Sequence, residues 1–224
     1  MSGWERMEVA FFRAAGRLQP VQAFLEELEP VERRVAAGNQ VERLAWLRVE
    51  DPPLPPPWDE PVEAELRALR VRVRGEVLRL IYRRTGNLFL LLHAIRSADS
   101  WIPERELRVA RRAGAQAGGN PPPAGALDGP IGQSLQAYIA GAEFEEQYRE
   151  VRLRLSAFEQ VARLLIRYRM DHGLSQAQLA RRAGISHSVV ARMETGHHHV
   201  NLDTVGRVAV ALRHRLLIAL EPYP

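Results

Sequence analysis

Capping and turn residues divide the last third of this chain into short helices whose ends the sequence itself defines. Gly173 and Gly184 are expected to end helices, because glycine readily adopts the left-handed backbone of a helix C-terminus. Ser175 and Ser186 are expected to cap the helices that follow, since a serine hydroxyl can accept a hydrogen bond from an unpaired backbone N–H. The predicted helices span residues 158–171, 176–182, 187–194 and 202–212, with a weak terminal strand over 215–220. The last third of the chain is therefore expected to be an all-α domain of short helices.

The third of these helices has a buried side and an outward side. Val189, Val190 and Met193 are spaced to reach the core of the bundle. The outward positions are His187, Ser188, Ala191 and Arg192. Two short helices joined by a glycine turn suit DNA recognition, because the second can enter the major groove while the first braces it across the backbone.

The segment "GLSQAQLARRAGISHSVVARMETG" resembles the Cro/repressor-like family of helix-turn-helix domains. The resemblance implies that Gln176 and Ser186 contact phosphate or the groove wall. His187, Ser188 and Arg192 would face the bases or the backbone. The full set of expected DNA contacts is Ser175, Gln176, Ser186, His187, Ser188, Arg192 and His197. Further phosphate candidates are Arg167, Arg169, Arg181 and Arg182, several of which could equally be solvated surface.

Three consecutive histidines, at positions 197–199, raise the question of a metal site. Adjacent side chains cannot all reach one ion without a sharp backbone bend, and no Cys or regularly spaced carboxylate accompanies them. We therefore expect no metal, and interpret the segment as a loop that contacts phosphate or lies in solvent.

A segment of Ala, Gly and Pro, over residues 113–132, separates the bundle from an unrelated domain. It lacks the large apolar side chains that a core needs, so it is interpreted as a linker. The expected organisation is a first domain over residues 1–112, the linker over 113–132, a helical arm over 133–157 and the helix-turn-helix domain over 158–224.

The first domain mixes helical and strand patterns and is predicted to be α+β. Val71 and Val73 alternate with arginines, and turn residues at Gly75 and Gly86 separate three strands between residues 69 and 95. This antiparallel meander is expected to have an apolar face packed on helices and a second face lined with guanidinium groups. A short helix over 103–112, with Pro103 in its first turn, is expected to close the domain.

Charge is distributed unevenly along the chain. All 31 basic residues are arginine, so roles that usually fall to lysine must fall to Arg or His. Residues 66–84 carry seven Arg against one acid, and residues 161–215 carry nine Arg against three acids, whereas residues 131–160 carry three Arg against five Glu. Two basic surfaces around an acidic arm predict two nucleic-acid contacts with an internal mask. The chain has no Cys, no apolar run of membrane-spanning length and no signal pattern, so a soluble cytoplasmic protein is expected.

Segments outside the bundle resemble narrower families. The arm beginning "SLQAYIAGAEFEEQYRE" and the ending "LLIALEP" look like HigA-type antitoxins, while "ALRVRVRGEVLRLIYRRTGNLFLLLHAI" with "PERELRVARR" resembles the HigB branch of the RelE toxin superfamily. Members of that branch are α+β endonucleases that cut messenger RNA in the ribosome. The resemblance implies catalytic roles for Arg70, Arg79, Tyr82, His93 and Arg96. Such a reaction needs activation of the ribose 2′-hydroxyl, cations around the phosphorane and an acid for the leaving oxygen.

The loop after His93 departs from that family. Where relatives carry several lysines, this chain has none in residues 97–103, so its contact with RNA is expected to be weaker. Without the resemblance, the arginines of the strand would be read as a solvated face, Tyr82 as a core residue and His93 as structural. The sequence therefore leaves open whether the domain is an active, latent or degenerate ribonuclease.

The predicted function is a toxin and an antitoxin of HigBA type fused in one chain, whose second half represses its operator and neutralises the first. The alternative is a transcriptional regulator in which the RelE-like domain has lost catalysis and serves dimerisation or partner binding. Operator DNA is the expected partner, with messenger RNA and the ribosome as candidates for the first domain. A homodimer is expected because one short recognition helix gives little specificity, and no cofactor or membrane contact is expected.

Overall fold

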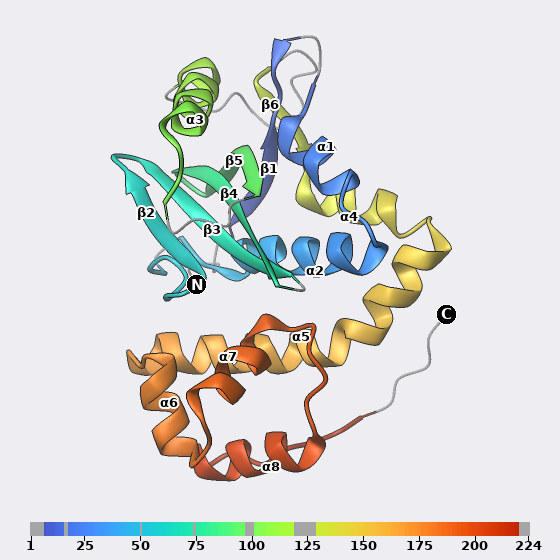
Figure 1. The fold of residues 1–224 in the computed structure, drawn as a ribbon, viewed down its shortest axis with the longest axis vertical. Helices are drawn as coiled ribbons and strands as arrows, with labels where there is room; N and C mark the ends of the chain where they lie inside the picture. The colour runs from blue at the N-terminus through green and yellow to red at the C-terminus, as the bar shows by residue number, and fades with distance from the viewer. Residues whose placement is uncertain are drawn as a thin grey trace, which may run out of the picture. The chain divides into compact units, whose positions relative to one another are not determined.

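The chain folds into two compact units, Met1–Arg154 and Leu155–Pro224. The structure, a computed structural model, describes residues 7–15, 18–49, 51–73, 75–96, 101–118 and 129–219 (Figure 1). One helix, α5 (Glu146–His172), runs through the boundary between the units. None of the helices in the described ranges combines the length and the apolar character that crossing a bilayer requires.

A six-stranded sheet forms the centre of the first unit. Its strands are β1 (Glu8–Phe12), β2 (Asp59–Glu63), β3 (Leu66–Val73), β4 (Glu76–Thr85), β5 (Leu88–Arg96) and β6 (Ile131–Ser134), in the order β2-β3-β4-β5-β1-β6. Strands β3, β4 and β5 are the expected meander. The sheet is mixed rather than wholly antiparallel, because β1 pairs with β5 in parallel register.

Glycine turns and strand pairing fix the register of the meander. Gly86, at φ +58°, lies in the turn between β4 and β5, where a side chain would be strained. Arg70 lies opposite Arg79 across β3 and β4, and the pairing of β4 with β5 is irregular between Ile81 and Tyr82. The register decides which of the candidate residues share a face.

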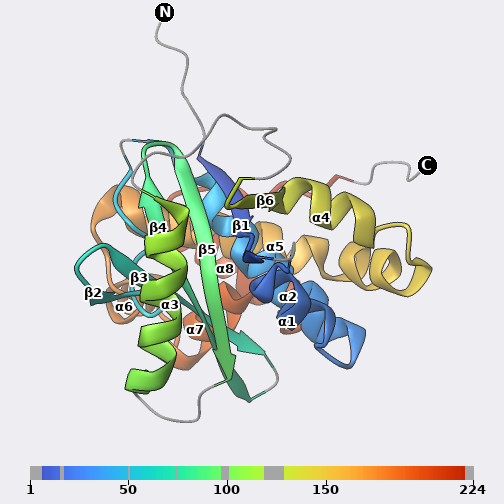
Figure 2. The same cartoon turned by 90° about the horizontal axis from the view of Figure 1, so that it is seen from above.

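Helices cover both faces of this sheet. Helix α3 (Glu104–Ala117) packs on the face that carries Ala68, Ile81 and Leu90. Leu69 and Leu80, which pair across the strands on the opposite face, are also buried, and α1 (Pro20–Glu26) and α2 (Val31–Glu42) contact the sheet (Figures 1 and 2). A 3₁₀ turn, η2 (Arg43–Trp46), follows α2. Leu69 and Leu80 thus form the expected apolar face, and the opposite face, which carries Arg70 and Arg79, is partly covered by α3 as well.

The segment expected to be a linker begins as helix. Ala113 and Ala117 belong to α3 and are buried in the core against the sheet. A Cβ on Gly114 would lie 3.5 Å from Leu92 Cδ1, so this part of α3 lies close to β5. Alanine favours helix and its small side chain allows close packing, which is why a stretch without large apolar residues still contributes to a core. Residues 119–128 of the expected linker lie outside the described part of the chain.

The acidic arm belongs to the first unit through residue 154. Its strand β6 pairs antiparallel with β1, and α4 (Leu135–Ala142) follows it, capped by Ser134. Tyr138 of α4 packs edge-on against Phe11 of β1, with ring centroids 5.4 Å apart. Polar contacts join the arm to α2: Glu145 with Arg34, Arg152 with Asn39 and Glu42, and Arg154 with Glu32.

The second unit is the expected helical bundle. Helices α6 (Gln176–Ala183), α7 (His187–Thr195) and α8 (Leu202–Ala211) match the predicted helices to within about one residue and pack with the last part of α5. Their shared core consists of Leu165, Leu179, Ala180, Ala183, Val190, Met193, Val208 and Leu212. Residues 214–219 form neither helix nor strand, so the predicted terminal strand is absent from the described part of this segment.

Candidate nucleic-acid interfaces

The two serines expected to cap helices in the second unit do so. Ser175 Oγ accepts a hydrogen bond from Gln178 N at 3.2 Å, and Gln178 Oε1 accepts one from Ser175 N at 2.7 Å, which together form a capping box. Ser186 Oγ accepts from Val189 N at 3.3 Å. Gly184, at φ +63°, makes the turn between α6 and α7. These local signals fix where the recognition helix α7 begins.

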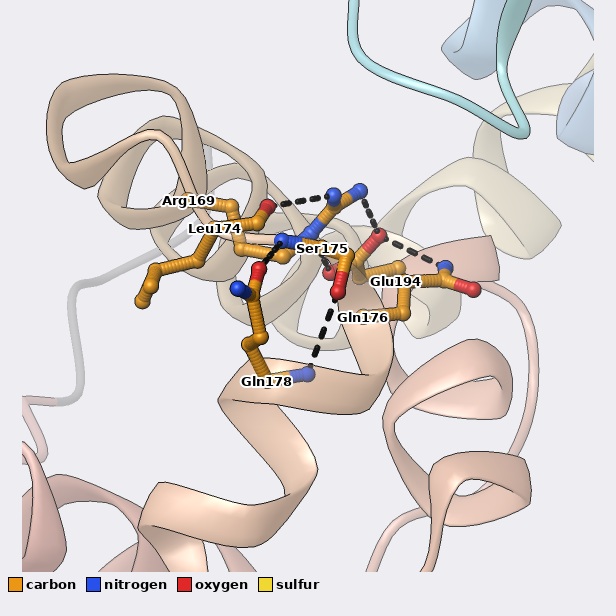
Figure 3. Close-up of polar contacts among 6 residues, drawn as sticks. All are labelled: Arg169, Leu174, Ser175, Gln176, Gln178 and Glu194. Atoms are coloured by element: carbon orange, nitrogen blue, oxygen red, sulfur yellow. Dashed lines mark hydrogen bonds and ion pairs between the residues drawn. The ribbon is translucent and has the colours of Figure 1, made fainter.

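A buried polar network joins α5, the start of α6 and the end of α7 (Figure 3). Arg169 of α5 donates from Nε and Nη2 to the two carboxylate oxygens of Glu194, at 2.6 and 2.8 Å. Gln176 Nε2 donates to Glu194 Oε2 at 2.9 Å, and Arg169 Nη1 donates to Leu174 O at 3.0 Å. The Arg169 and Glu194 side chains are 1% and 0% exposed. The network holds the C-terminal end of α7 against α5 and the start of α6.

This network changes the interpretation of two candidate DNA contacts. Arg169, a phosphate candidate, is fully buried and bound to Glu194, so it supports the fold rather than the surface. Gln176 is 6% exposed and its amide nitrogen is directed at Glu194. Any contact of Gln176 with DNA would have to use its amide oxygen or its backbone N–H. Ser175 is likewise engaged as a cap.

The outward residues of α7 are exposed as a row. His187, Ser188 and Arg192 are exposed, whereas Val190 and Met193 on the other side are buried. Ser186 is also exposed, and its Oγ lies 2.9 Å from Ser188 Oγ. The row offers hydrogen-bond donors, acceptors and one permanent cation, which are the groups that read base edges and phosphates.

The histidine loop lies directly after α7. His197 is half-buried, and its Nδ1 lies 3.2 Å from Thr195 O. Burial lowers the pKa of His198, and the positive charge of Arg192 lowers it further. No group of three His, Cys, Asp or Glu side chains suited to a metal ion occurs within the described ranges.

Three of the five candidate catalytic residues share one face of the first unit's sheet. Arg70 and Arg79 are paired across β3 and β4, and His93 is paired with Ile81, which packs on the α3 side. Cross-strand partners point to the same side of a sheet. Tyr82, three residues after Arg79 in the same strand, pairs with Arg67 and points to the opposite side.

The two paired arginines are bound to an acid. Arg79 is 1% exposed and donates from Nε to Glu60 Oε1 at 2.8 Å. Arg70 Nε lies 3.8 Å from Glu60 Oε2. Burial lowers the pKa of Arg70, and the neighbouring positive charges of Arg79 and Arg72 lower it further. Glu60 thus lies where a phosphate group would have to bind these cations.

Tyr82 is a core residue. It is 0% exposed and packs edge-on against Phe89, with ring centroids 5.3 Å apart. Burial raises its pKa strongly, and the neighbouring carboxyl of Asp59 adds to the rise. A phenol in this environment stays protonated and does not meet solvent, so the catalytic role that the resemblance implies for Tyr82 stays a prediction that this geometry does not support.

His93 and Arg96 have separate environments. His93 Nε2 lies 2.8 Å from Glu106 Oε2 of α3, and this hydrogen bond lowers the pKa of Glu106. Arg96 is exposed at the end of β5, and its guanidinium lies 5.8 Å from the ring centroid of Phe24. Residues 97–100 of the lysine-free loop lie outside the described residues. Glu60 and Glu106 were not among the residues expected at this site, although Glu60 lies in a short polar segment just before the arginine-rich strand.

Comparison with known proteins identifies the second unit. Residues 165–214 match the family model described as Helix-turn-helix. A stretch of 58 residues, 26% of this chain, is 36% identical to "Antitoxin HicB 1" of Photorhabdus laumondii subsp. laumondii and covers 37% of that protein. The second unit is therefore a helix-turn-helix domain, which supports DNA binding. The antitoxin in this match carries the name HicB rather than HigA, and the match covers about a quarter of this chain.

Proposed function

We propose that this chain is a DNA-binding repressor of its own operator, fused to a HigB-type domain over residues 1–112 of the first unit, which the arm holds inactive. The observation that supports DNA binding most directly is the exposed row of α7, Ser186 to Ser188 with Arg192, on a helix anchored by a buried network. A rigidly held recognition helix limits the side-chain freedom lost on binding. The similarity to a protein named as an antitoxin supports the toxin–antitoxin setting.

Operator binding can be tested by fluorescence anisotropy with the promoter of the protein's own gene. Arg192→Ala and His187→Ala are each expected to weaken binding about tenfold, the loss of one good base or phosphate contact. Arg207→Ala is the matched control, because Arg207 is equally exposed but lies on α8. If Arg192 contacts phosphate, its loss also reduces the dependence of log affinity on log salt by about one unit. Unchanged affinity for both α7 variants would refute the assignment.

The second unit is proposed to act as a homodimer. Two half-sites about 34–36 Å apart give the specificity that one short helix lacks. An apolar groove of about 390 Å³ between α5 and α8 is a candidate dimer interface, since Leu164 and Leu217 in it are 70% and 73% exposed. Leu164→Glu should yield monomers in sedimentation, whereas Val210→Glu, at a residue 74% exposed outside this groove, should not. Monomeric wild type at micromolar concentration would contradict the dimer.

We propose that the arm is the part that neutralises the HigB-type domain. Strand β6 extends the sheet at β1, and the arm's acids and arginines pair with α2. The burial of Arg79 and its ion pair with Glu60 favour the alternative, in which the first unit has lost catalysis and serves the regulator as a partner-binding piece.

Expression of the first unit without the arm distinguishes these two proposals. A fragment should end at residue 118 rather than 112, because Ala113 and Ala117 are core residues of α3. Growth arrest with cleaved messenger RNA, abolished by Arg79→Ala and relieved by residues 129–224 supplied in trans, supports a neutralised nuclease. Harmless accumulation of the soluble fragment supports the retired domain.

A further inference from the structure

Helix α8 has a second apolar side that the core of its own unit does not use. Val205 and Val208 pack on that core, whereas Leu202 and Val210 are 63% and 74% exposed. The two exposed residues lie within an arc of about 80° on one side of the helix and about 12 Å apart along its axis. The outer side of a surface helix is usually polar. Large apolar side chains in a row on that side indicate a contact with another molecule.

Gly206 lies midway between these two residues, on the same side of α8. It is helical, and a Cβ placed on it would meet no atom within 4 Å, so the fold of this unit does not require a glycine here. Glycine inside a helix lowers stability relative to alanine, but it lets another backbone approach closely. A hollow of about 490 Å³ lies at this place, with Gly206, Val210 and Ala183 in its lining. The position therefore suits the point where a second helix crosses α8.

Two opposite charges lie along one edge of the same face. Asp203 and Arg207 are exposed and one helical turn apart, and neither side chain has an ion-pair partner among the described residues. Both also line the hollow at Gly206. A face that carries one acid, one base and an apolar row between its ends is complementary to a second copy of itself. The charges therefore identify the occupant as the same face of another molecule of this chain.

The order of these residues also fixes the direction of the second helix. If a two-fold axis passes beside Gly206 and the helices are antiparallel, Leu202 of each copy lies opposite Val210 of the other. Asp203 of each copy then lies about 3 Å along the axis from Arg207 of the other, an offset that an arginine side chain spans. Both ion pairs form on one side of the crossing. Parallel helices would instead place the two charged edges on opposite sides, where no pair could form.

We propose that the outer side of α8 binds the same side of α8 in a second copy of this chain, with the helices antiparallel and crossing at Gly206. This face shares no residue with the apolar groove between α5 and α8, so one molecule can contact two others. It buries far less than the roughly 1,200 Å² of a stable interface, so the contact is weak unless the copies are already held close together. Dimers bound at adjacent operators would be held in this way. That consequence rests on the proposed function, whereas the contact itself does not.

Cross-linking of the full chain without DNA tests the contact. The protein has no cysteine, so an introduced thiol is unique. Leu202→Cys and Val210→Cys, tagged differently and mixed at high concentration, should be joined by a short bismaleimide at least about tenfold faster than Leu202→Cys and Ala177→Cys, whose second thiol is at an exposed residue of α6. Two copies of Leu202→Cys should also react slowly, because antiparallel helices hold these positions about 12 Å apart along the axis.

Charge reversal supplies a control that separates the contact from folding. In the cysteine-bearing chains, Asp203→Arg and Arg207→Asp each bring like charges together across the crossing and should slow cross-linking about fivefold. The double variant restores both ion pairs with their polarity exchanged, so it should recover the original rate. Because it retains any effect of both changes on the helix itself, the recovery reports the contact alone.

Gly206→Gln should change stability and association in opposite directions. Glutamine favours helix and the position is open, so the melting temperature should rise, yet the longer side chain keeps the two backbones apart and should reduce cross-linking to the rate of the α6 control.

Four results would overturn the proposal. They are cross-linking of Leu202→Cys with Val210→Cys no faster than the α6 control, a faster reaction between two copies of Leu202→Cys, a double charge variant no better than the single variants, and an unchanged rate in Gly206→Gln. Because DNA is absent from these reactions, failure of operator binding and failure of this contact are observed separately.

Discussion

Breaking the buried ion pair of the second unit should destabilise that unit more than any surface change. In Glu194→Leu, Arg169 Nε, Arg169 Nη2 and Gln176 Nε2 all lose their acceptor. At roughly 1–3 kcal/mol for each buried group left unpaired, the loss would be about 3–9 kcal/mol. Relaxation and entry of water limit such losses, and removing one partner of a buried pair usually costs about 3–5 kcal/mol. That is a large part of a small domain's stability.

Replacing the other partner, in Arg169→Met, should lower the free energy of unfolding by a similar amount, because it leaves the Glu194 carboxylate buried without its cation. The double variant Arg169→Met with Glu194→Leu should recover most of this loss, since apolar side chains can replace a buried pair without leaving a lone charge. Urea unfolding followed by helical circular dichroism gives the free energies, and hydrogen exchange at the amides of α7 assigns the loss to this unit.

A matched control is the exposed pair of Arg167 and Asp171, one helical turn apart on α5 with a nearest N–O distance of 3.9 Å. Removing Asp171 should change the free energy of unfolding by less than about 1 kcal/mol. The reasoning is refuted if Glu194→Leu costs no more than Asp171→Ala, or if the double variant is as unstable as the sum of the single variants.

Further predictions concern caps, pH and the sheet. Ser186→Ala should lower stability by about 1 kcal/mol through loss of the cap on α7, while Ser188→Ala should change it little; equal losses in urea unfolding would contradict the cap. Because the hydrogen bond from His93 lowers the folded-state pKa of Glu106, its stabilisation is present above the carboxyl's ordinary pKa and is lost as pH falls through the lowered value. Glu106→Gln should therefore flatten the acid limb of the stability–pH curve below about pH 4.5, and an unchanged limb would argue against this pair. Glu60→Gln should raise the affinity of the first unit for phosphate-bearing RNA if Glu60 masks Arg70 and Arg79, whereas unchanged binding in a filter assay would exclude the mask.

The helices of the second unit could be predicted because their signals are local. A serine cap and its N–H partner lie three residues apart, and Gly184 makes its turn without help from distant residues. The apolar spacing of Val190 and Met193 then identified the buried side of α7 and, by difference, the exposed row.

The buried network and the sheet pairing could not be predicted in this way. Arg169 and Glu194 are 25 residues apart, and both looked like surface residues in a sequence rich in charge. Strand β1 pairs with β5 and β6, which follow it by about 80 and 120 residues, and nothing local specifies such partners. These long-range pairings decide which faces are buried.

The division of the candidate catalytic residues between two faces of the sheet was missed for a simpler reason. Arg79 and Tyr82 are three residues apart, a spacing that brings side chains together on a helix but sends them to opposite sides of a strand. A resemblance assigned both to one site, whereas strand geometry alone would have separated them.

Strand β6 has a consequence for how the chain before residue 119 could separate from the chain after residue 128. Its backbone completes the sheet at β1, so a protease that cuts between residues 118 and 129 severs the covalent tie and leaves the hydrogen-bonded strand in place. If β6 left the sheet, β1 would expose unpaired backbone N–H and C=O groups, which could pair with a strand of a second molecule and lead to aggregation. Separation of residues 1–118 from the rest of the chain would therefore require β6 to leave the sheet as well as cleavage of the backbone, so a single cut would not be enough.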